Sequence, residues 1–280
     1  MKDLKISIIT INYNNCSGLE QTLKSVAAQN CRNYEHIVID GGSTDGSKEL
    51  IESYSDKISY WVSEPDNGVY NAMNKGALAA KGDYCMFVNS GDQLHSSKTI
   101  AEIIANEPST DIVMGMVENM STSGTSSVWH PCEEDKISLV YLRDNPIHHP
   151  GALIRTSLQQ NIPYNESLRI CSDRQFFIEA LILNNCSYST IPVVMNRFAP
   201  QGLSGIQNDR KMIEEDQIYL KELFPPRLIR DIFATNDRIQ QTTRRMASYY
   251  TLTNKILKLN NSILDFADVV LYLKKHFRNK

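Results

Sequence analysis

The sequence predicts an α/β fold in which a mostly parallel sheet is flanked by helices and followed by a helical C-terminal extension. Short runs of β-branched and aromatic residues recur along the first third of the chain, and such runs favour strands. Segments with the apolar spacing of amphipathic helices separate these runs. Regular alternation of strands and helices is typical of a doubly wound parallel sheet.

The expected elements follow one another closely. The isoleucine-rich run 6–11 forms the first strand. The apolar run 84–88 is bounded by turn-forming residues on both sides, which favours a strand that is covered on both faces. The second helix has Ser43, Thr44 and Asp45 available as caps. The expected strands are 6–11, 36–39, 58–62 and 84–88, and the expected helices are 19–29, 47–54 and 69–81.

Composition and charge narrow the classes of function. The 280 residues have a net charge of −3, so there is no basic excess of the kind that nucleic-acid binding requires. The six cysteines are scattered without a CxxC pair, and reduced thiols are expected. The first residues do not resemble a signal peptide, and no long apolar stretch suggests a membrane span. A cytoplasmic location is therefore expected.

Charge divides the chain into two regions. Residues 225–280 contain 11 Lys and Arg against 4 Asp and Glu, whereas the rest of the chain contains 18 against 28. We therefore expect one domain at 1–224 and a basic helical extension at 225–280. A basic amphipathic helix at 263–278 can lie on an anionic membrane surface, here the inner membrane face. The alternative is that this helix packs on its own domain or on a second copy of the chain.

Polar side chains follow three of the expected strands, close to the point where each strand ends. These are Tyr13, Asp40 and Asp92, and ligands of open α/β sheets bind beyond the carboxyl ends of the strands. No GxGxxG motif follows the first strand and no Walker motif is present, which disfavours a dinucleotide-binding domain and a P-loop enzyme. Asp92 offers the kind of oxygen ligand that a hard divalent cation on a nucleotide diphosphate prefers.

Four blocks of sequence resemble one known family. They are Ser7-Ile8-Ile9-Thr10-Ile11-Asn12-Tyr13-Asn14, the block 40–46 (Asp-Gly-Gly-Ser-Thr-Asp-Gly), the block 63–76 and the block 82–92. Their order and spacing resemble the family 2 glycosyltransferases, and in particular enzymes that build bacterial capsular polysaccharide and exopolysaccharide. The resemblance implies the GT-A fold, which is Rossmann-like, and inverting transfer of a sugar from a nucleotide diphosphate donor.

The resemblance implies a nucleotide site at the ends of the first two strands. Thr10 to Tyr13 would surround the base and ribose, and Tyr13 would stack on the base. Asp40 would accept a hydrogen bond from a base N–H, which favours uracil or thymine, although guanine also offers one. The alternatives are that Tyr13 caps the core and that Asp40 stabilises a turn.

The third block would line the donor side of the cleft. The resemblance places Asp66, Gly68, Asn71, Asn74 and Lys75 there, and Lys75 would face the diphosphate. The alternative is an ordinary turn followed by a surface helix that carries the two asparagines one turn apart.

The metal site departs from the family pattern. Relatives often have Asp-x-Asp-Asp, whereas this chain has Asn89-Ser90-Gly91-Asp92. Asp92 is then the one carboxylate ligand for Mn²⁺ or Mg²⁺, which keeps waters and often uses one or two carboxylates. Asn89 would contact the donor sugar. His149 would be a further metal or phosphate ligand, or else would bond to backbone beside Pro150.

The second half of the chain would supply the catalytic base. Inverting transfer needs a base that removes the proton from the acceptor hydroxyl. The resemblance assigns this role to Asp173, at the start of an apolar helix, although an N-cap aspartate is the alternative. Arg197 begins a closing segment, 197–205, and would lie near phosphate.

The expected function is transfer of a sugar, with a UDP-sugar favoured, to a saccharide or lipid-linked saccharide acceptor in cell-surface polysaccharide synthesis. Two rivals remain open. One is a catalytically silent subunit that binds nucleotide sugar within a polysaccharide assembly. The other is a sugar-nucleotide pyrophosphorylase, which would need a glycine-rich basic loop after the first strand, where this chain has Asn12-Tyr13-Asn14-Asn15.

Overall fold

A mixed β-sheet runs through the first unit of the chain. In the computed structural model the described residues are 4–121, 123–198 and 209–231. Within them the strand order is β3-β2-β1-β4-β8-β6-β9-β5, and β7 pairs with β6. The chain divides into the units Met1–Leu223 and Phe224–Lys280. The expected basic helix at 263–278 and most of the closing segment 197–205 lie outside the described residues.

The first half of the sheet is parallel and has the expected alternation. β1 (Ile6–Asn12) pairs in parallel with β2 (Tyr34–Asp40) and with β4 (Tyr84–Phe87), and β3 (Tyr60–Ser63) extends β2. All residues of β1 and β4 are buried, as expected for strands covered on both faces. The predicted α/β class is confirmed, and the polar strand ends meet at one edge of the sheet.

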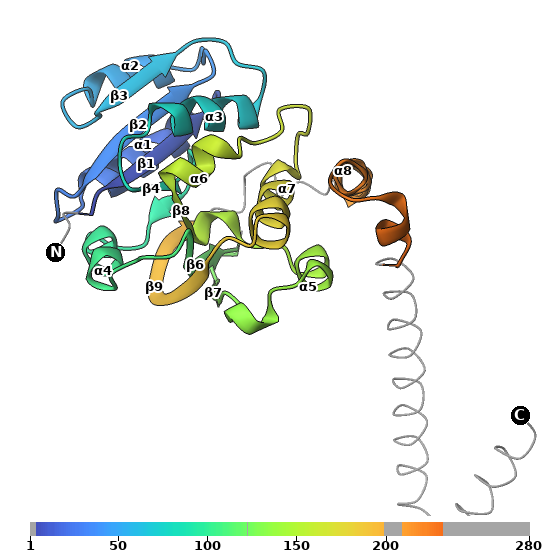
Figure 1. Cartoon of the computed structure of the whole chain (residues 1–280). Helices are drawn as coiled ribbons and strands as arrows, with labels where there is room; N and C mark the ends of the chain where they lie inside the picture. The colour runs from blue at the N-terminus through green and yellow to red at the C-terminus, as the bar shows by residue number, and fades with distance from the viewer. Residues whose placement is uncertain (1–3, 122, 199–208, 232–280) are drawn as a thin grey trace, which may run out of the picture. The chain divides into compact units, whose positions relative to one another are not determined.

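Helices cover both faces of this half (Figure 1). α1 (Cys16–Ala27) and α2 (Ser47–Ser53) form a buried cluster with one face of β2, whereas α3 (Val69–Ala79) contacts β1 and β2 from the other face. Asn15 caps α1 by accepting a hydrogen bond from the Gly18 N–H. The N-cap residue of α2 is Gly46, so none of the three candidate caps occupies that position; Asp45, just before it, accepts hydrogen bonds from the Ser47 N–H and hydroxyl.

The second half of the sheet contains antiparallel pairs that the sequence did not predict. β8 (Ala152–Arg155) runs antiparallel to both β4 and β6 (Ile112–Met120), and β5 (Gln93–Leu94) runs antiparallel to β9 (Tyr188–Phe198). β6 and β9 pair in parallel with a register shift. β7 (Ser126–Trp129) forms a hairpin with β6. The sheet is therefore more mixed than expected.

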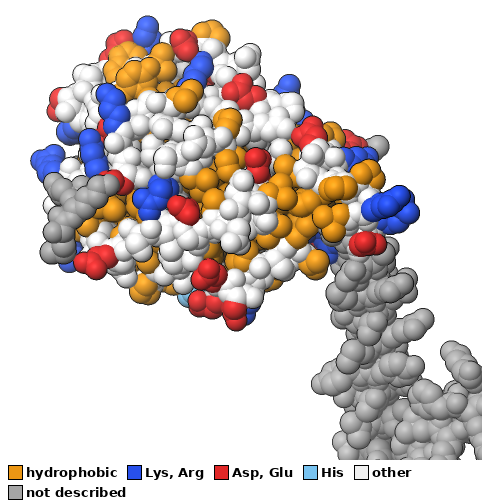
Figure 2. Space-filling model, in the orientation of Figure 1, with side chains coloured by type: hydrophobic (Ala, Val, Ile, Leu, Met, Phe, Trp, Pro, Cys, Tyr) orange, Lys and Arg blue, Asp and Glu red, His pale blue; other side chains and the backbone are white. Residues whose placement is uncertain are grey.

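Short helical segments and the 15-residue α8 complete the unit. They are α4 (Thr99–Ala105), η1 (Glu134–Lys136), α5 (Leu139–Asp144), η2 (His149–Gly151), α6 (Thr156–Asn161), α7 (Ser172–Ile178), the π-helical turn η3 (Glu179–Leu183) and α8 (Asp209–Leu223). On the face shown in Figure 2, acidic and basic side chains are scattered and do not form a patch of one sign. Among the described helices, none combines the length and the apolar character needed to cross a bilayer.

Candidate active site

Asp40, at the end of β2, is the most completely hydrogen-bonded carboxylate at the carboxyl edge of the parallel strands. Oδ1 accepts from Asn12 Nδ2 (2.8 Å) and Ser43 Oγ (2.6 Å). Oδ2 accepts from the Ser43 N–H (2.9 Å) and Ser63 Oγ (2.6 Å). Burial opposes ionisation, but these hydrogen bonds outweigh it and hold the pKa of Asp40 below its ordinary value. The carboxylate therefore ties the ends of β1, β2 and β3 together.

Tyr13 and Asp66 converge above Gly41, the residue after Asp40. Tyr13 is 67% exposed, so its ring is available for stacking. A Cβ atom on Gly41 would lie 2.5 Å from Asp66 Oδ2 and 3.1 Å from Tyr13 Cδ2. Asp66 Oδ1 accepts a hydrogen bond from the Gly68 N–H at 2.8 Å. The absence of a side chain at Gly41 thus leaves room for an aromatic ring and a carboxylate to meet.

The loop that carries Asp92 is held by α1. Thr22 Oγ1 donates to the Asp92 carbonyl oxygen (2.6 Å) and accepts from the Gly91 N–H (3.0 Å). Gly91 has a φ of 104°, a conformation that favours glycine. The Asp92 side chain is 5% exposed. The backbone at Asp92 is therefore fixed, and a buried carboxylate follows the central strand.

Oxygen atoms near this loop fit a hard cation only in part. The buried amide oxygens of Asn12 and Asn89 have no hydrogen-bond partner among the described residues, and carboxylate and amide oxygens are suitable ligands for Mg²⁺. In the described part of the chain, no three His, Cys, Asp or Glu side chains form a metal-binding group. A cation held by Asp92 would need donor phosphate oxygens and waters to complete its coordination. The residues present are compatible with such a site.

His149, at the start of η2, is buried in an aromatic layer. Its Nε2 atom lies 2.7 Å from the Tyr164 hydroxyl oxygen, and its ring lies against Phe87 and Phe177. Tyr164 donates its own proton to Gln159 Oε1 at 3.0 Å, so Nε2 is the protonated nitrogen of His149. Burial lowers the pKa of His149 to about 4. The histidine is thus neutral, and its role as a metal or phosphate ligand stays a prediction.

Asp173, the second residue of α7, is half-buried. Burial raises the pKa of its carboxyl, while hydrogen bonds from the Arg174 N–H and the Tyr70 hydroxyl act in the opposite direction. Both of these bonds are made to Oδ1, at 2.9 and 3.1 Å. Oδ2 makes no hydrogen bond to any residue that the structure describes. One oxygen is fixed and the other is available, as a general base requires.

The loop before α7 is anchored by α8. Glu215 accepts hydrogen bonds from the successive N–H groups of Arg169, Ile170 and Cys171, at 2.8–2.9 Å. The next residue of α8, Asp216, pairs with Arg174 at 2.8 Å. These contacts hold the chain on both sides of Asp173. Sequence reasoning missed Glu215 because nothing in the order of residues links α8 to this loop.

The two asparagines of α3 have partners within the protein. Asn74 accepts from the Tyr164 N–H and donates to the Tyr164 carbonyl, both at 2.9 Å. Asn71 and Asn74 both donate to the Glu166 carboxylate at 2.9 Å. They therefore connect α3 to the loop after α6, and their predicted contact with the donor stays a prediction.

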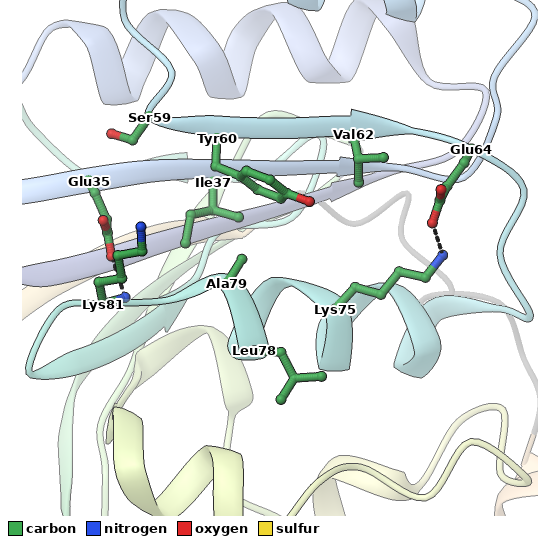
Figure 3. A pocket seen from close by; sticks show the side chains of 10 residues that line it. All are labelled: Glu35, Ile37, Ser59, Tyr60, Val62, Glu64, Lys75, Leu78, Ala79 and Lys81. Carbon is green, nitrogen blue, oxygen red and sulfur yellow. Dashed lines mark hydrogen bonds and ion pairs between the residues drawn. The ribbon is translucent and has the colours of Figure 1, made fainter.

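Lys75 lies at a pocket between β3 and α3 (Figure 3). The pocket has a volume of about 490 Å³ and includes Tyr60 and Leu78 in its lining. Lys75 Nζ forms an ion pair with Glu64 at 2.7 Å at one end of it. Its predicted contact with the diphosphate would require this ion pair to open or to be shared.

Two further predicted residues lie beside the site. Thr10 is fully buried, and its hydroxyl donates to the Val88 carbonyl at 2.9 Å, so its side chain joins β1 to the end of β4. Arg197, near the end of β9, is opposite Gln93 in the β5–β9 register. Its Nε atom bonds to Glu118 at 2.9 Å. The sequence alone indicated no site role for Tyr70, Ser63 or Glu118, and it indicated Ser43 only as a candidate helix cap.

Comparisons with known proteins identify relatives over most of the chain. The family model "Glycosyl transferase family 2" matches residues 7–188. An uncharacterized glycosyltransferase of Mycobacterium tuberculosis is 31% identical over 214 residues, which are 71% of this chain and 76% of the relative. The PGL/p-HBAD biosynthesis glycosyltransferase of Mycobacterium bovis is 32% identical over 180 residues, 61% of this chain and 68% of the relative.

Solved structures share the fold at lower identity. S. aureus TarS 1–349 in complex with UDP has a TM-score of 0.58 and 21% identity, and the match covers 70% of this chain but only 60% of that one. The mannosyltransferase PcManGT from Pyrobaculum calidifontis, in complex with GDP-Man and Mn²⁺, has a TM-score of 0.59 and 14% identity over 99% of this chain and 81% of that one. The predicted resemblance and fold are confirmed. The chain belongs to glycosyl transferase family 2 and is a glycosyltransferase with the GT-A fold.

Proposed function

We propose that this glycosyltransferase moves a sugar from a nucleotide diphosphate donor, with a UDP-sugar favoured, to a saccharide acceptor with inversion. The observation that supports this best is the state of Asp173, whose Oδ1 is held by Tyr70 while Oδ2 has no hydrogen-bond partner among the described residues. Its raised pKa makes it a stronger base than an ordinary carboxylate.

The donor would lie at the carboxyl edge of the parallel strands. Tyr13 would stack on the base, and Asp40 would fix the strand ends or accept from a base N–H. Asp66, Gly68, Asn71, Lys75, Asn89, Thr10 and Arg197 are the remaining proposed donor contacts, and Asn74 would support them by holding the Tyr164 backbone. The UDP in the TarS complex and the GDP-Man in the PcManGT complex support a nucleotide-sugar donor, because the three chains share this fold.

The chemistry at the sugar would be an in-line displacement. The acceptor hydroxyl gives its proton to Asp173 Oδ2 as its oxygen bonds to the anomeric carbon, and the bond to the departing diphosphate breaks. A divalent cation held by Asp92 and the diphosphate would stabilise the charge of the leaving group. The Mn²⁺ in the PcManGT complex supports this part of the proposal.

Titration calorimetry tests the donor and metal assignments. UDP, GDP and dTDP would be titrated with and without Mn²⁺ into wild type and Asp92→Ala. We expect metal-dependent binding of one nucleotide, with UDP favoured, and loss of the metal dependence in the variant. Equal binding with and without Mn²⁺ in wild type would remove Asp92 from the metal site.

Hydrolysis of the bound donor tests the base. We expect wild type to release UDP slowly from a UDP-sugar without acceptor, and Asp173→Asn to lose this activity while its UDP affinity stays the same. Undiminished turnover by Asp173→Asn would overturn the assignment of the base.

We propose that the acceptor is a saccharide or lipid-linked saccharide of cell-surface polysaccharide synthesis, reached at the cytoplasmic face of the membrane. The basic balance of residues 225–280 supports the membrane contact. Flotation with vesicles of zwitterionic lipid, alone or with anionic lipid, tests the membrane contact. Recovery of the protein with anionic vesicles alone is the expected result, and recovery with neither would contradict it.

A further inference from the structure

We propose that Asp66, and not Asp40, reads the base of the nucleotide donor, and that it selects a base with a ring N–H on its pairing edge. The inference rests on the proposed donor site. It starts from the two carboxylates that lie next to Tyr13, because a base stacked on that exposed ring would present its edge to one of them.

Asp40 has no capacity left for a base. A carboxylate has about four lone-pair positions, and Asn12, Ser43 and Ser63 supply four hydrogen bonds to it. The side chain is also 0% exposed. A base N–H would have to displace one of these donors, which hold the end of β2 to the ends of β1 and β3 and to the loop at Ser43, so Asp40 acts on the site through the backbone that it holds.

Asp66 has the capacity that Asp40 lacks. It is half-buried, and its Oδ1 is fixed by the Gly68 N–H at 2.8 Å. Its Oδ2 makes no hydrogen bond to a described residue and lies 2.5 Å from the position that a Gly41 Cβ would take, next to the Tyr13 ring. One oxygen is therefore held by the loop while the other is presented beside the stacking surface.

Gly41 makes this arrangement possible. A side chain at position 41 would occupy the space that the Asp66 carboxylate now fills. The carboxylate thus reaches the base from the loop after β3 and not from the end of β2. This loop is fixed at Gly42, where the space for a Cβ is bounded by the Pro65 backbone nitrogen at 3.1 Å.

The chemistry of an ionised carboxylate defines the base. It accepts hydrogen bonds and donates none, so it pairs with the N3–H of uracil or thymine or with the N1–H of guanine. Cytosine and adenine present a lone pair at the corresponding ring nitrogen, which the carboxylate repels. Unpaired polar groups of this kind give strong discrimination in enzyme sites.

The test compares UDP with CDP, which share ribose and diphosphate and differ only at N3 and C4 of the base. Dissociation constants would be measured by calorimetry with Mn²⁺ for wild type, Asp66→Asn and Asp40→Asn. If guanine proves to be preferred, GDP and ADP take their places. Asp56→Asn, an exposed aspartate in the turn after α2, is the charge-matched control.

We expect wild type to bind UDP at least tenfold more tightly than CDP. In Asp66→Asn the affinity for UDP should fall about tenfold and the preference over CDP should nearly disappear, because an amide can both donate and accept. Asp40→Asn should weaken both nucleotides by a similar factor, and Asp56→Asn should match wild type. A purely structural role for Asp66 would not change the ratio of the two constants.

The outcomes separate the two proposals. If wild type binds none of the nucleotides, the proposed donor site fails and this inference fails with it. If wild type prefers UDP but Asp66→Asn keeps the same preference, only the inference fails. If the preference for UDP over CDP is lost in Asp40→Asn and kept in Asp66→Asn, then Asp40 and not Asp66 recognises the base.

Discussion

The Tyr70 hydroxyl oxygen lies 3.1 Å from Oδ1 of Asp173, although the two residues are 103 positions apart. The same hydroxyl lies 2.7 Å from the Ile170 carbonyl oxygen. One side chain of α3 therefore reaches both the proposed base and the loop that leads to it. The half of the chain that would bind the donor is thereby joined to the half that would activate the acceptor.

Removal of this hydroxyl should change the pH profile of the enzyme. The hydrogen bond from Tyr70 lowers the pKa of Asp173 against the raising effect of burial, so Tyr70→Phe should raise that pKa. A base must be ionised, and the acid limb of kcat should therefore move to higher pH. At low pH we expect a loss of about fivefold, the equivalent of one ordinary hydrogen bond. The measurement is kcat against pH.

Tyr60→Phe is the matched control for that experiment, because Tyr60 is a 49%-exposed tyrosine of β3. It should leave the profile unchanged. An acid limb at the same pH in Tyr70→Phe and wild type would show that Tyr70 does not act on the ionisation of the base.

Glu215 should control the rate through the placement of Asp173. Glu215→Ala removes the acceptor of three consecutive N–H groups, so α7 should begin in a less defined position. We expect kcat to fall about tenfold or more with the donor KM within about twofold, because small displacements of catalytic groups are costly. Glu215→Gln, which keeps one acceptor oxygen, should be intermediate.

Two further variants make the Glu215 experiment specific. Glu214→Gln removes a charge from an exposed neighbouring position of α8 and should retain wild-type kinetics. Addition of Glu215→Ala to Asp173→Asn should cause no further loss, because Glu215 acts through Asp173. Additive losses in the double variant would contradict that route.

Asp40 should make the stability of the protein depend on pH. A carboxylate whose pKa is lowered in the folded state stabilises the fold above its ordinary pKa, and this stabilisation is lost as the pH falls through the folded value. Asp40→Asn should lower the free energy of unfolding by about 1–3 kcal/mol near neutral pH. The difference from wild type should shrink below about pH 4, as measured by denaturant unfolding. A constant difference at all pH values would refute the assignment.

The buried histidines should cause a second loss of stability at milder acidity. Burial lowers the pKa of His36 to about 3. Burial also lowers the pKa of His148 to about 4, and the neighbouring His149 adds a smaller effect in the same direction. Since unfolded histidine titrates near about 6.5, the neutral forms stabilise the fold above that pH. This stabilisation is lost as the pH falls from about 6.5 toward these values. Each histidine contributes at most about 1.4 kcal/mol per pH unit.

Unfolding of His148→Gln across this range tests the contribution of one of these histidines. Glutamine can still donate to Asn119, the present partner of His148 at 2.9 Å, so the variant should fold and show a shallower acid dependence. His130→Gln, at an exposed position, should follow the wild-type curve. An acid dependence as steep in His148→Gln as in wild type would show that His148 does not contribute.

Asn74 provides a test that separates a donor contact from a structural one. Its amide bonds in both directions to the Tyr164 backbone, so Asn74→Ala leaves polar groups unpaired. We expect a loss of about 1–3 kcal/mol of unfolding free energy, with the nucleotide Kd within about twofold of wild type. Asn30→Ala, on the surface after α1, is the control. Weaker nucleotide binding at unchanged stability would instead support the contact with the donor that the sequence predicted.

The parallel half of the sheet could be predicted because its signals are local. The apolar run of β1 and the buried run of β4 each lie within a few residues of their own turn signals. β8 and β5 could not be predicted in the same way. They are short, at four and two residues, and they become strands by pairing with β4, β6 and β9.

The residues of the candidate site likewise fall into those that local sequence identifies and those that only long-range contacts identify. Asp40, Asp92 and Asp173 could be found because each lies at the end of a strand or the start of a helix in a recognisable block. Tyr70 and Glu215 could not be assigned, since their roles depend on contacts 103 and 44 residues or more away. The different roles of Asp40 and Asp66 could be assigned only from the structure, because they depend on which carboxylate already accepts its full set of hydrogen bonds.

The close packing of α3 on the sheet has a consequence for attempts to alter this enzyme. A Cβ atom at Gly76 would overlap Ile9 of β1, so position 76 sets how deeply the whole helix lies. Asn71, Asn74 and Tyr70 move with that helix. Libraries that randomise position 76 would change the depth of all three side chains at once, whereas randomisation at Leu78, which is 72% exposed on the same helix, would alter the surface and leave that depth as it is.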